Sequence, residues 1–291
     1  MAELILSADG LEAGLKPQVG GALTHFADLS GAAPVDLLRR ATPGFDDALD
    51  SACFPLVPFC NRVRDGRFTF DGRQVRLQPN LPGQTHPLHG QGWRSPWTVA
   101  EAGKAFAELA YSHAPDDWPW AYEARLTVAL RERGLDVTLA CRNLADTAMP
   151  CGLGLHPYYP CDGATVLDTR AERVWTVDDE IMPVEPAPAE GRYGLEQRLV
   201  CGQGLDNGYD GWSGRADIRW PGRGRALRLT SEAPRFQLYS PPQGGLFVAE
   251  PVTNQNAALN RPQEQWTGLG LWILQPGESC RMQARFQVLD I

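Results

Sequence analysis

Two segments of the chain place a single ionisable side chain where an apolar run ends. In GLGLHPYYP (152–160), His156 follows a glycine-spaced apolar run and precedes a proline. In LFVAEPVTNQNAALN (246–260), Glu250 ends a second apolar run and precedes Pro251. An ionised carboxylate in apolar surroundings is costly unless it has partners or a raised pKa. An imidazole and a carboxylate held in this way are suited to general acid–base catalysis.

Two further segments add groups that bind hydroxyls or stack on flat rings. These groups are Asn61 and Arg62 in PFCNRVRDGRFTFDGR, and His89 and Trp93 in HPLHGQGWRSPW. Each segment alone has a structural explanation: a hairpin with an arginine at its base, a loop with buried aromatic rings, or a core histidine. Together they form the set expected of a pocket for a neutral sugar, because aromatic planes stack on the apolar faces of a pyranose and charged side chains bind its hydroxyls. Tyr158, two residues after His156, is expected to wall the same pocket.

The elements that must hold these side chains are predicted to be β-strands. Apolar residues alternate with polar ones over residues 122–130, 135–141 and 280–288, the pattern of half-buried antiparallel strands. The run GLFVAEP predicts a buried central strand, and 30 glycines and 24 prolines punctuate the chain at strand-like intervals. Only residues 33–41 suggest a short helix, and the Pro-rich residues 181–192 predict a surface loop. We therefore expect an all-β fold, a large antiparallel sandwich with few short helices, formed by one domain over residues 1–291.

Composition narrows the function classes. The formal net charge of −8 argues against a general binder of nucleic-acid backbones, and no apolar run approaches the roughly 18 residues that span a membrane. The first residues show no basic n-region, so we expect a cytoplasmic protein without a signal peptide. The seven cysteines are odd in number and widely spaced, which predicts reduced, mostly buried thiols. His86 and His89 lack a third nearby ligand, so no metal site is expected.

An ordered set of motifs resembles the aldose 1-epimerase (galactose mutarotase) family, in its bacterial mutarotase-related subgroup. The motifs are NRVRDGRFTFDG, LHGQGWRSPW, GLGLHPYYP, LDNGYDGWSG, VAEPVTNQNAALN and LQPGES, and the similarity runs over nearly the whole chain. The resemblance implies a β-supersandwich with a sugar cleft on one face and no cofactor. It also implies a small-molecule sugar as the binding partner, and it leaves open whether the protein forms a homodimer.

The resemblance assigns roles residue by residue. It makes His156 the general acid and Glu250 the general base. It makes the sugar-binding residues Asn61, Arg62, His89 and Asp206, with Asp210 as a competitor for the place of Asp206. The implied activity is interconversion of the α and β anomers of a free aldose. This chemistry needs a protonated histidine beside an ionised glutamate, which is the ordinary order of their pKa values.

Two alternatives remain at this point. A hexose-6-phosphate 1-epimerase would use the same acid and base and add arginines for the phosphate, for which Arg64, Arg67 and Arg94 are the candidates. A non-catalytic sugar-binding or sensing protein on the same fold would be expected to lack the acid or the base, and this chain has both. The sequence does not distinguish glucose, galactose, a pentose or a 6-phosphate as the sugar.

Overall fold

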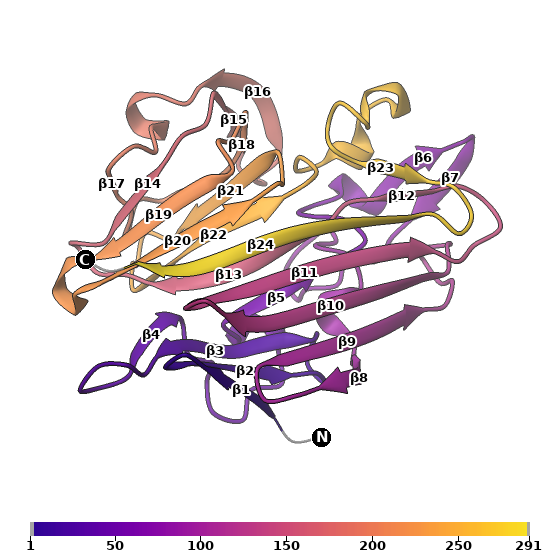
Figure 1. The fold of residues 1–291 in the computed structure, drawn as a ribbon. Helices are drawn as coiled ribbons and strands as arrows, with labels where there is room; N and C mark the ends of the chain where they lie inside the picture. Colours follow the sequence, from indigo (N-terminus) through magenta and orange to yellow (C-terminus); the bar gives the residue numbers. More distant parts are fainter. Residues whose placement is uncertain (1–2, 290–291) are drawn as a thin grey trace.

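The computed structural model describes residues 3–289, which form two large antiparallel β-sheets (Figure 1). The eleven-stranded sheet has the order β1 (Leu4–Ala8), β2 (Leu11–Lys16), β3 (Ala22–Asp28), β5 (Cys53–Leu56), β13 (Gly154–Pro160), β22 (Leu246–Val252), β21 (Arg235–Ser240), β18 (Leu205–Asp210), β15 (Arg173–Val177) and β16 (Pro183–Pro188), with β4 (Val35–Leu38) paired to β3. The nine-stranded sheet has the order β17 (Arg198–Leu199), β14 (Val166–Thr169), β19 (Arg215–Trp220), β20 (Arg225–Ser231), β24 (Ser279–Leu289), β11 (Gly134–Asn143), β10 (Tyr122–Arg131), β9 (Phe106–His113) and β8 (Thr98–Ala102).

Short elements complete the described chain. Two small sheets pair β6 (Arg67–Phe70) with β7 (Arg73–Arg76) and β12 (Met149–Cys151) with β23 (Trp272–Leu274). The helical segments are single 3₁₀ turns: η1 (Ala48–Asp50), η2 (Arg64–Gly66), η3 (Gly92–Arg94), η4 (Gly191–Tyr193), η5 (Pro221–Arg223), η6 (Ala258–Asn260) and η7 (Gln263–Gln265). Within residues 3–289, no helix has the length and apolar character needed to cross a bilayer.

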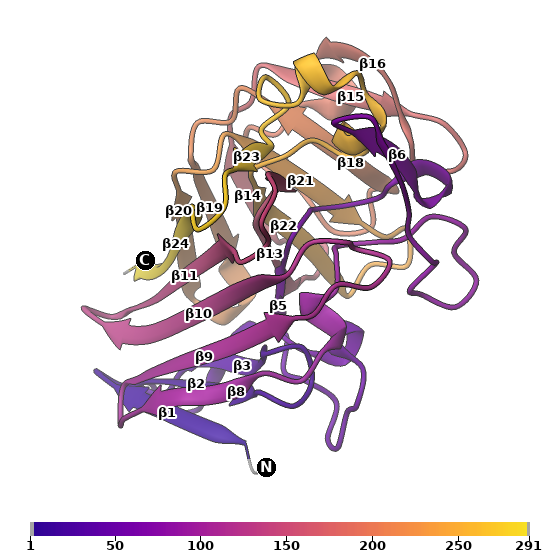
Figure 2. The same ribbon diagram turned by 90° about the vertical axis from the view of Figure 1, so that its right-hand side faces the viewer.

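The two large sheets lie as two layers, and the main core fills the space between them (Figure 2). The alternating segments predicted from the sequence form β10, β11 and β24, and these strands are neighbours in the nine-stranded sheet. Their apolar residues are buried, and they alternate with residues of the outer face. The all-β antiparallel prediction is therefore confirmed.

The strands β13 and β22 lie side by side near the middle of the eleven-stranded sheet and carry the two predicted catalytic residues. Leu155 and Tyr159 of β13 belong to the core between the sheets. Because side chains alternate along a strand, His156 and Tyr158 face the opposite side of the sheet. The pairing of Gly154 with Val252 and of Tyr158 with Val248 sets the register, and it puts His156 opposite Glu250.

Three local predictions are wrong. Residues 33–41 contain strand β4 instead of a helix, because pairing with β3 buries Leu37 and Leu38 and overrides the local pattern. The predicted loop 181–192 contains β16 at a sheet edge, where prolines are tolerated because an edge strand can leave N–H positions unpaired. Cys161 and Cys201 form a disulfide across a sequence separation of 40, whereas the other five cysteines are free and buried as expected.

Candidate active site

A pocket of about 420 Å³ opens on the face of the eleven-stranded sheet that points away from the main core. Its floor comes from adjacent strands of that sheet, and its rim comes from loops around residues 61–62 and 88–93. All eight site residues expected from the sequence line it: Asn61, Arg62, His89, Trp93, His156, Tyr158, Asp206 and Glu250. Residues far apart in sequence thus meet in one place, as a binding site requires.

His156 and Glu250 face each other in this pocket. The His156 Nε2 atom lies 3.7 Å from Glu250 Oε1, and both residues are buried. The His156 ring is fixed by stacking on Phe54, its cross-strand neighbour on β5, with ring centroids 4.5 Å apart and an interplanar angle of 12°. An imidazole and a carboxyl group at this distance can exchange a proton after a small movement.

Burial favours the uncharged form of both groups. It lowers the pKa of His156 to about 3, with the Arg39 charge also acting to lower it. Burial raises the pKa of Glu250 well above its usual value; the Asp206 charge adds to this rise and Arg62 opposes it. The order of pKa values expected from the sequence is therefore reversed in this structure, because desolvation outweighs the attraction between the two partners.

Asn61 and His89 hold each other through reciprocal hydrogen bonds. The Asn61 backbone N–H donates to His89 Nδ1 at 3.1 Å, and the His89 backbone N–H donates to the Asn61 carbonyl oxygen at 2.9 Å. Burial, His156 and Arg62 lower the pKa of His89 well below its usual value. Since Nδ1 of this neutral ring accepts a hydrogen bond, its proton must sit on Nε2, which makes His89 a donor.

Both residues of this pair have backbone angles that side chains rarely adopt. The φ angle is 61° at Asn61 and 60° at His89, in the left-handed region. Asparagine and histidine adopt this region more often than most residues, but any residue other than glycine is uncommon there. Strained backbone of this kind gathers at functional sites, where the surrounding structure compensates its cost.

Arg62 and Asp206 form the second charged pair of the pocket. Arg62 Nη2 lies 3.6 Å from Asp206 Oδ2, and Gln237 Nε2 donates to Asp206 Oδ1 at 2.6 Å. Burial raises the pKa of Asp206, and the Arg62 charge acts against that rise. The competitor Asp210 does not line this pocket; it accepts a hydrogen bond from Trp175 Nε1 at 2.7 Å and pairs with Arg235 at 2.8 Å.

Several pocket atoms are prepared to bind a polar ligand. Within residues 3–289, Asn61 Nδ2 and Glu250 Oε2 are buried and have no hydrogen-bond partner. Buried polar groups of this kind are uncommon and usually mark a place that a ligand or water fills. Trp93 and Tyr158 supply aromatic surface beside them, and Trp93 is fixed by donating from Nε1 to the Leu88 carbonyl oxygen at 3.1 Å.

Sequence reasoning missed other lining residues, chiefly Arg39 and Tyr239. Arg39 lies in the segment expected to be helical, and the register of β18 with β21 places Tyr239 beside Asp206. Nothing in the local pattern around either residue indicates a pocket. Long-range strand pairing alone brings them there.

The arginines considered for a 6-phosphate do not line the pocket. Arg64 pairs with Asp178 at 2.9 Å and with Glu180 at 3.3 Å, whereas Arg94 pairs with Asp47 at 3.6 Å. Arg67 lies on the β6–β7 hairpin, in a separate hollow. Two of the three charges are therefore already matched by carboxylates of this chain.

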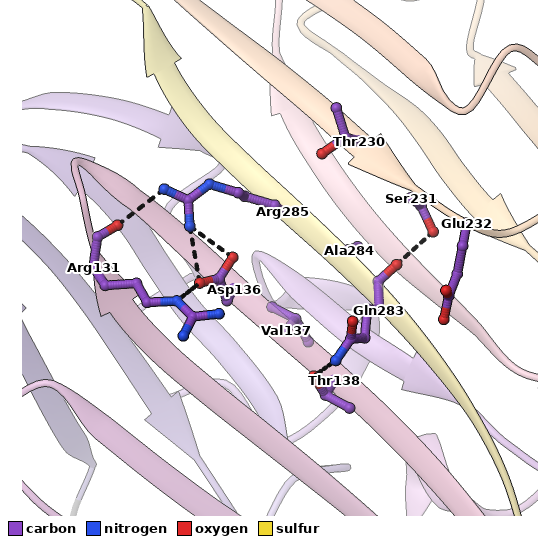
Figure 3. A pocket seen from close by; sticks show the side chains of 10 residues that line it. All are labelled: Arg131, Asp136, Val137, Thr138, Thr230, Ser231, Glu232, Gln283, Ala284 and Arg285. Atoms are coloured by element: carbon purple, nitrogen blue, oxygen red, sulfur yellow. Dashed lines mark hydrogen bonds and ion pairs between the residues drawn. The ribbon is translucent and has the colours of Figure 1, made fainter.

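A second polar hollow lies on the nine-stranded sheet, over β11, β20 and β24 (Figure 3). Three of its charged groups form one cluster: Arg285 Nη1 donates to both Asp136 carboxylate oxygens at 2.9 Å, and Arg131 pairs with the same carboxylate. Ser231 donates to the Gln283 carbonyl oxygen at 2.6 Å. It has neither a histidine nor an aromatic ring in its lining, so it lacks the acid–base and stacking groups that line the first pocket.

Comparisons with known proteins identify the family and the fold. The sequence matches the aldose 1-epimerase family over residues 7–287. It is 32% identical over 255 residues to the uncharacterised Escherichia coli K12 protein YphB. This alignment covers 83% of this chain and 85% of YphB. It is 25% identical over 133 residues to the aldose 1-epimerase of Escherichia coli K12. That alignment covers 44% of this chain and 37% of the enzyme. The solved structure of a candidate aldose 1-epimerase from Escherichia coli K12 superposes with a TM-score of 0.90 at 29% identity, over 100% of this chain and 99% of that one.

The match to the family extends over nearly all of the described residues, and a relative above 30% identity covers most of the chain. The fold agrees with that of a solved candidate member along its whole length. The chain therefore belongs to the aldose 1-epimerase family.

Proposed function

We propose that this protein is an aldose 1-epimerase that interconverts the α and β anomers of a free aldose by opening and closing the sugar ring. The observation that carries this proposal is the buried pair of His156 and Glu250, with 3.7 Å between Nε2 and Oε1, on the floor of a pocket lined by hydroxyl-binding groups. Family membership supports the reaction class.

Ring opening needs two proton transfers. The Glu250 carboxylate takes the proton of the C1 hydroxyl, the bond between C1 and the ring oxygen breaks, and its electron pair passes to the ring oxygen. The ring oxygen takes the proton of the His156 imidazolium. Rotation about C1–C2 and closure on the other face of the aldehyde, with both transfers reversed, give the second anomer. Each positioned proton-transfer group typically contributes about 10²–10⁴-fold to the rate.

The shifted pKa values of His156 and Glu250 determine which protonation state of the pair the pocket favours. With a cyclic sugar the reactive form of the pair is imidazolium and carboxylate, and with the open-chain aldehyde it is neutral imidazole and carboxylic acid. Burial favours the neutral form, because it lowers the pKa of His156 and raises that of Glu250. The pocket therefore favours the state that accompanies the open-chain intermediate. A bound cyclic sugar offsets this preference when its C1 hydroxyl donates to the carboxylate and its ring oxygen accepts from the imidazolium.

The remaining residues bind and orient the sugar. Arg62 and Asp206, paired at 3.6 Å, form hydrogen bonds with adjacent hydroxyls of the sugar. The His89 Nε2–H donates to a further sugar hydroxyl. Asn61 Nδ2 lacks a partner within residues 3–289, so it has a free donor. Trp93 and Tyr158 provide apolar surface for the sugar ring. No step of this scheme uses a metal, an organic cofactor, a nucleic acid or a membrane. We place the reaction in the cytoplasm. Light scattering would determine whether the protein is a monomer or a homodimer.

The test is catalysis of anomerisation by the purified protein and its variants. Fresh α-D-glucose, α-D-galactose and a pentose are followed by polarimetry and by the proton NMR signals of the anomeric positions. We expect Glu250→Gln and His156→Asn each to lower kcat by about 10²-fold or more. Sugar binding, measured by calorimetry, should persist in Glu250→Gln, because the amide keeps the shape of the carboxyl group.

The same panel separates the enzyme from a sugar-binding protein. A wild-type protein that binds a sugar in the panel without accelerating its anomerisation would support the sensing function and overturn the proposal. A rate in Glu250→Gln within about threefold of wild type would remove Glu250 from the role of base.

A further inference from the structure

We infer that Arg39 forms an anion subsite of this pocket and that the preferred aldose carries a single negative charge on the substituent at C5, as the carboxylate of a hexuronic acid does. This inference rests on the proposed function, because it uses the roles of His156 and Glu250 to orient the sugar.

Arg39 is the pocket cation that has no carboxylate partner. Arg62 is paired with Asp206 at 3.6 Å, and His156 faces Glu250 at 3.7 Å. Within residues 3–289, no carboxylate oxygen lies within 4.0 Å of the Arg39 guanidinium. Burial lowers the pKa of this half-buried guanidinium, and the more distant Asp50 carboxylate offsets that shift only in part, so an anionic ligand would restore the balance.

The guanidinium is held in a fixed position. Its Nε atom donates to the Ser51 carbonyl oxygen at 3.0 Å, and Nη2 donates to the Leu49 carbonyl oxygen at 2.5 Å. Its plane lies over the Tyr158 ring, with the central carbon 3.7 Å from the ring centroid. These contacts occupy Nε and Nη2, and the structure gives Nη1 no hydrogen bond among the described residues. One end of the fork is therefore free to donate to an anion, and little entropy is lost because the side chain is already ordered.

The position of Arg39 relative to the catalytic pair indicates which part of the sugar it meets. The Arg39 backbone N–H donates to the Tyr158 carbonyl oxygen at 2.8 Å, which ties it to β13 on the side away from β22 and Glu250. Across the sheet, Arg39 therefore lies beside one edge of β13, His156 lies on β13, and Glu250 lies on β22 at its other edge. The rings of Tyr158 and His156 are 4.7 Å apart. If His156 protonates the ring oxygen and Glu250 serves the C1 hydroxyl, then the other neighbour of the ring oxygen, C5, is directed toward Arg39.

One unmatched cation fits one negative charge better than two. A carboxylate on C6 would meet Arg39 through a charge-assisted hydrogen bond, whereas a phosphate dianion would need further cations. Arg64 and Arg94, which lie on loops near the pocket, are already matched by carboxylates of this chain. The structure thus favours a monoanionic sugar over a sugar 6-phosphate.

The experiment compares kcat/KM for glucuronate, glucose and glucose 6-phosphate by exchange NMR of the anomeric signals. For the wild type we expect kcat/KM with glucuronate to exceed that with glucose by about tenfold or more, as expected for a charge-assisted contact. In Arg39→Gln this ratio should fall by about tenfold, and Arg39→Lys should recover part of it because the charge is kept. Arg40→Gln is the matched control, since the neighbouring Arg40 pairs with Asp36 at 2.8 Å outside this pocket.

Each other outcome contradicts the inference in a distinct way. If glucuronate is no better than glucose while glucose is still anomerised, or if Arg39→Gln and Arg40→Gln change the ratio equally, Arg39 has only a structural role. If glucose 6-phosphate is the best substrate, the site takes a dianion. If no sugar is anomerised, the proposed function fails, and calorimetry with glucuronate then decides the subsite: loss of binding in folded Arg39→Gln supports it, and equal binding overturns it.

Discussion

At the scale of single residues, burial of Glu250 makes the free energy of unfolding depend on pH. Its pKa in the folded protein is raised well above the usual value, so over a range above about pH 4.3 the folded state keeps a proton that the unfolded state has lost. The unfolded state then binds fewer protons, and the free energy of unfolding falls as pH rises through this window. The carboxyl group of the proposed base therefore destabilises the fold as the pH rises through this window.

Replacing Glu250 by glutamine should remove this cost. We predict that Glu250→Gln raises the thermal midpoint relative to wild type, and by more at about pH 8 than at about pH 5. Asp217→Asn is the control: burial alone would raise the pKa of Asp217, but hydrogen bonds from Arg228 and Arg215 hold it at about 2, so it is ionised at both pH values. An equal shift for Glu250→Gln at the two pH values would show that its carboxyl group is ionised in the folded protein.

In the proposed reaction, His156 and Glu250 together set the pH profile. The catalytic pair is competent while it holds one proton in total. With a His156 pKa of about 3 and a raised Glu250 pKa, the acid limit of that condition lies near pH 3. We predict that kcat/KM stays within about twofold between about pH 5 and pH 3.5. With ordinary pKa values the pair would gain a second proton below about pH 4.3, and kcat/KM would fall about tenfold per pH unit below it. Polarimetry with Glu250→Gln protein as the blank measures the profile.

At the scale of elements, the segment after β22 holds the loop that carries Asn61 and Arg62. Asn254 accepts from the Cys60 backbone N–H at 3.1 Å, and Asn256 accepts from the Arg62 backbone N–H at 2.9 Å. Asn260 accepts from the Arg64 backbone N–H at 2.7 Å. The loop has few sheet hydrogen bonds of its own, so the asparagine side chains replace the missing ladder. This accounts for the three asparagines of VTNQNAALN, which do not line the pocket.

Removing one of these asparagines should disturb sugar binding more than chemistry. We predict that Asn256→Ala raises KM about tenfold and lowers kcat less, because the Arg62 backbone loses its partner while His156 and Glu250 stay in the sheet. Asn256→Asp should rescue part of the loss, since its side chain still accepts from the Arg62 N–H. Asn260→Ala removes a comparable contact two residues further along and should leave KM within about twofold. Equal KM values in Asn256→Ala and Asn260→Ala would rule out a positioning role for Asn256.

At the scale of the whole molecule, the sequence predicts strands well and their partners poorly. The half-buried strands β10, β11 and β24 are visible because alternation along the chain is a local signal. The meeting of residues 61, 89, 156, 206 and 250 depends on the order β5, β13, β22, β21, β18, which no local pattern encodes. The family resemblance assigned six lining residues in advance, and the aromatic residues of the motifs added Trp93 and Tyr158, although the roles of all eight stay predictions. Arg39 was missed because its segment has a helix-like pattern that pairing with β3 overrides.

The disulfide between Cys161 and Cys201 is another feature that only the three-dimensional fold indicates. Cys161 directly follows β13. The chain between the two cysteines forms β14 and β17 of the nine-stranded sheet and β15 and β16 of the eleven-stranded sheet. The bond closes this excursion beside the pocket wall: the Cys161 backbone N–H donates to the Gly245 carbonyl oxygen, and Gly244, a lining residue, lies next to Cys201 Sγ.

Closing this loop should stabilise the fold measurably. For a sequence separation of 40, restriction of the unfolded chain is worth about 4 kcal/mol when the bond adds no native strain. We predict that dithiothreitol lowers the thermal midpoint of the wild type and that Cys201→Ser lowers it by a similar amount and abolishes the effect of the reductant. Cys53→Ser is the matched control for a free buried thiol, and it should leave the response to reductant intact. A wild-type midpoint that is independent of reductant, together with two more titratable thiols in the unfolded protein than the five free cysteines account for, would show that Cys161 and Cys201 are reduced in solution.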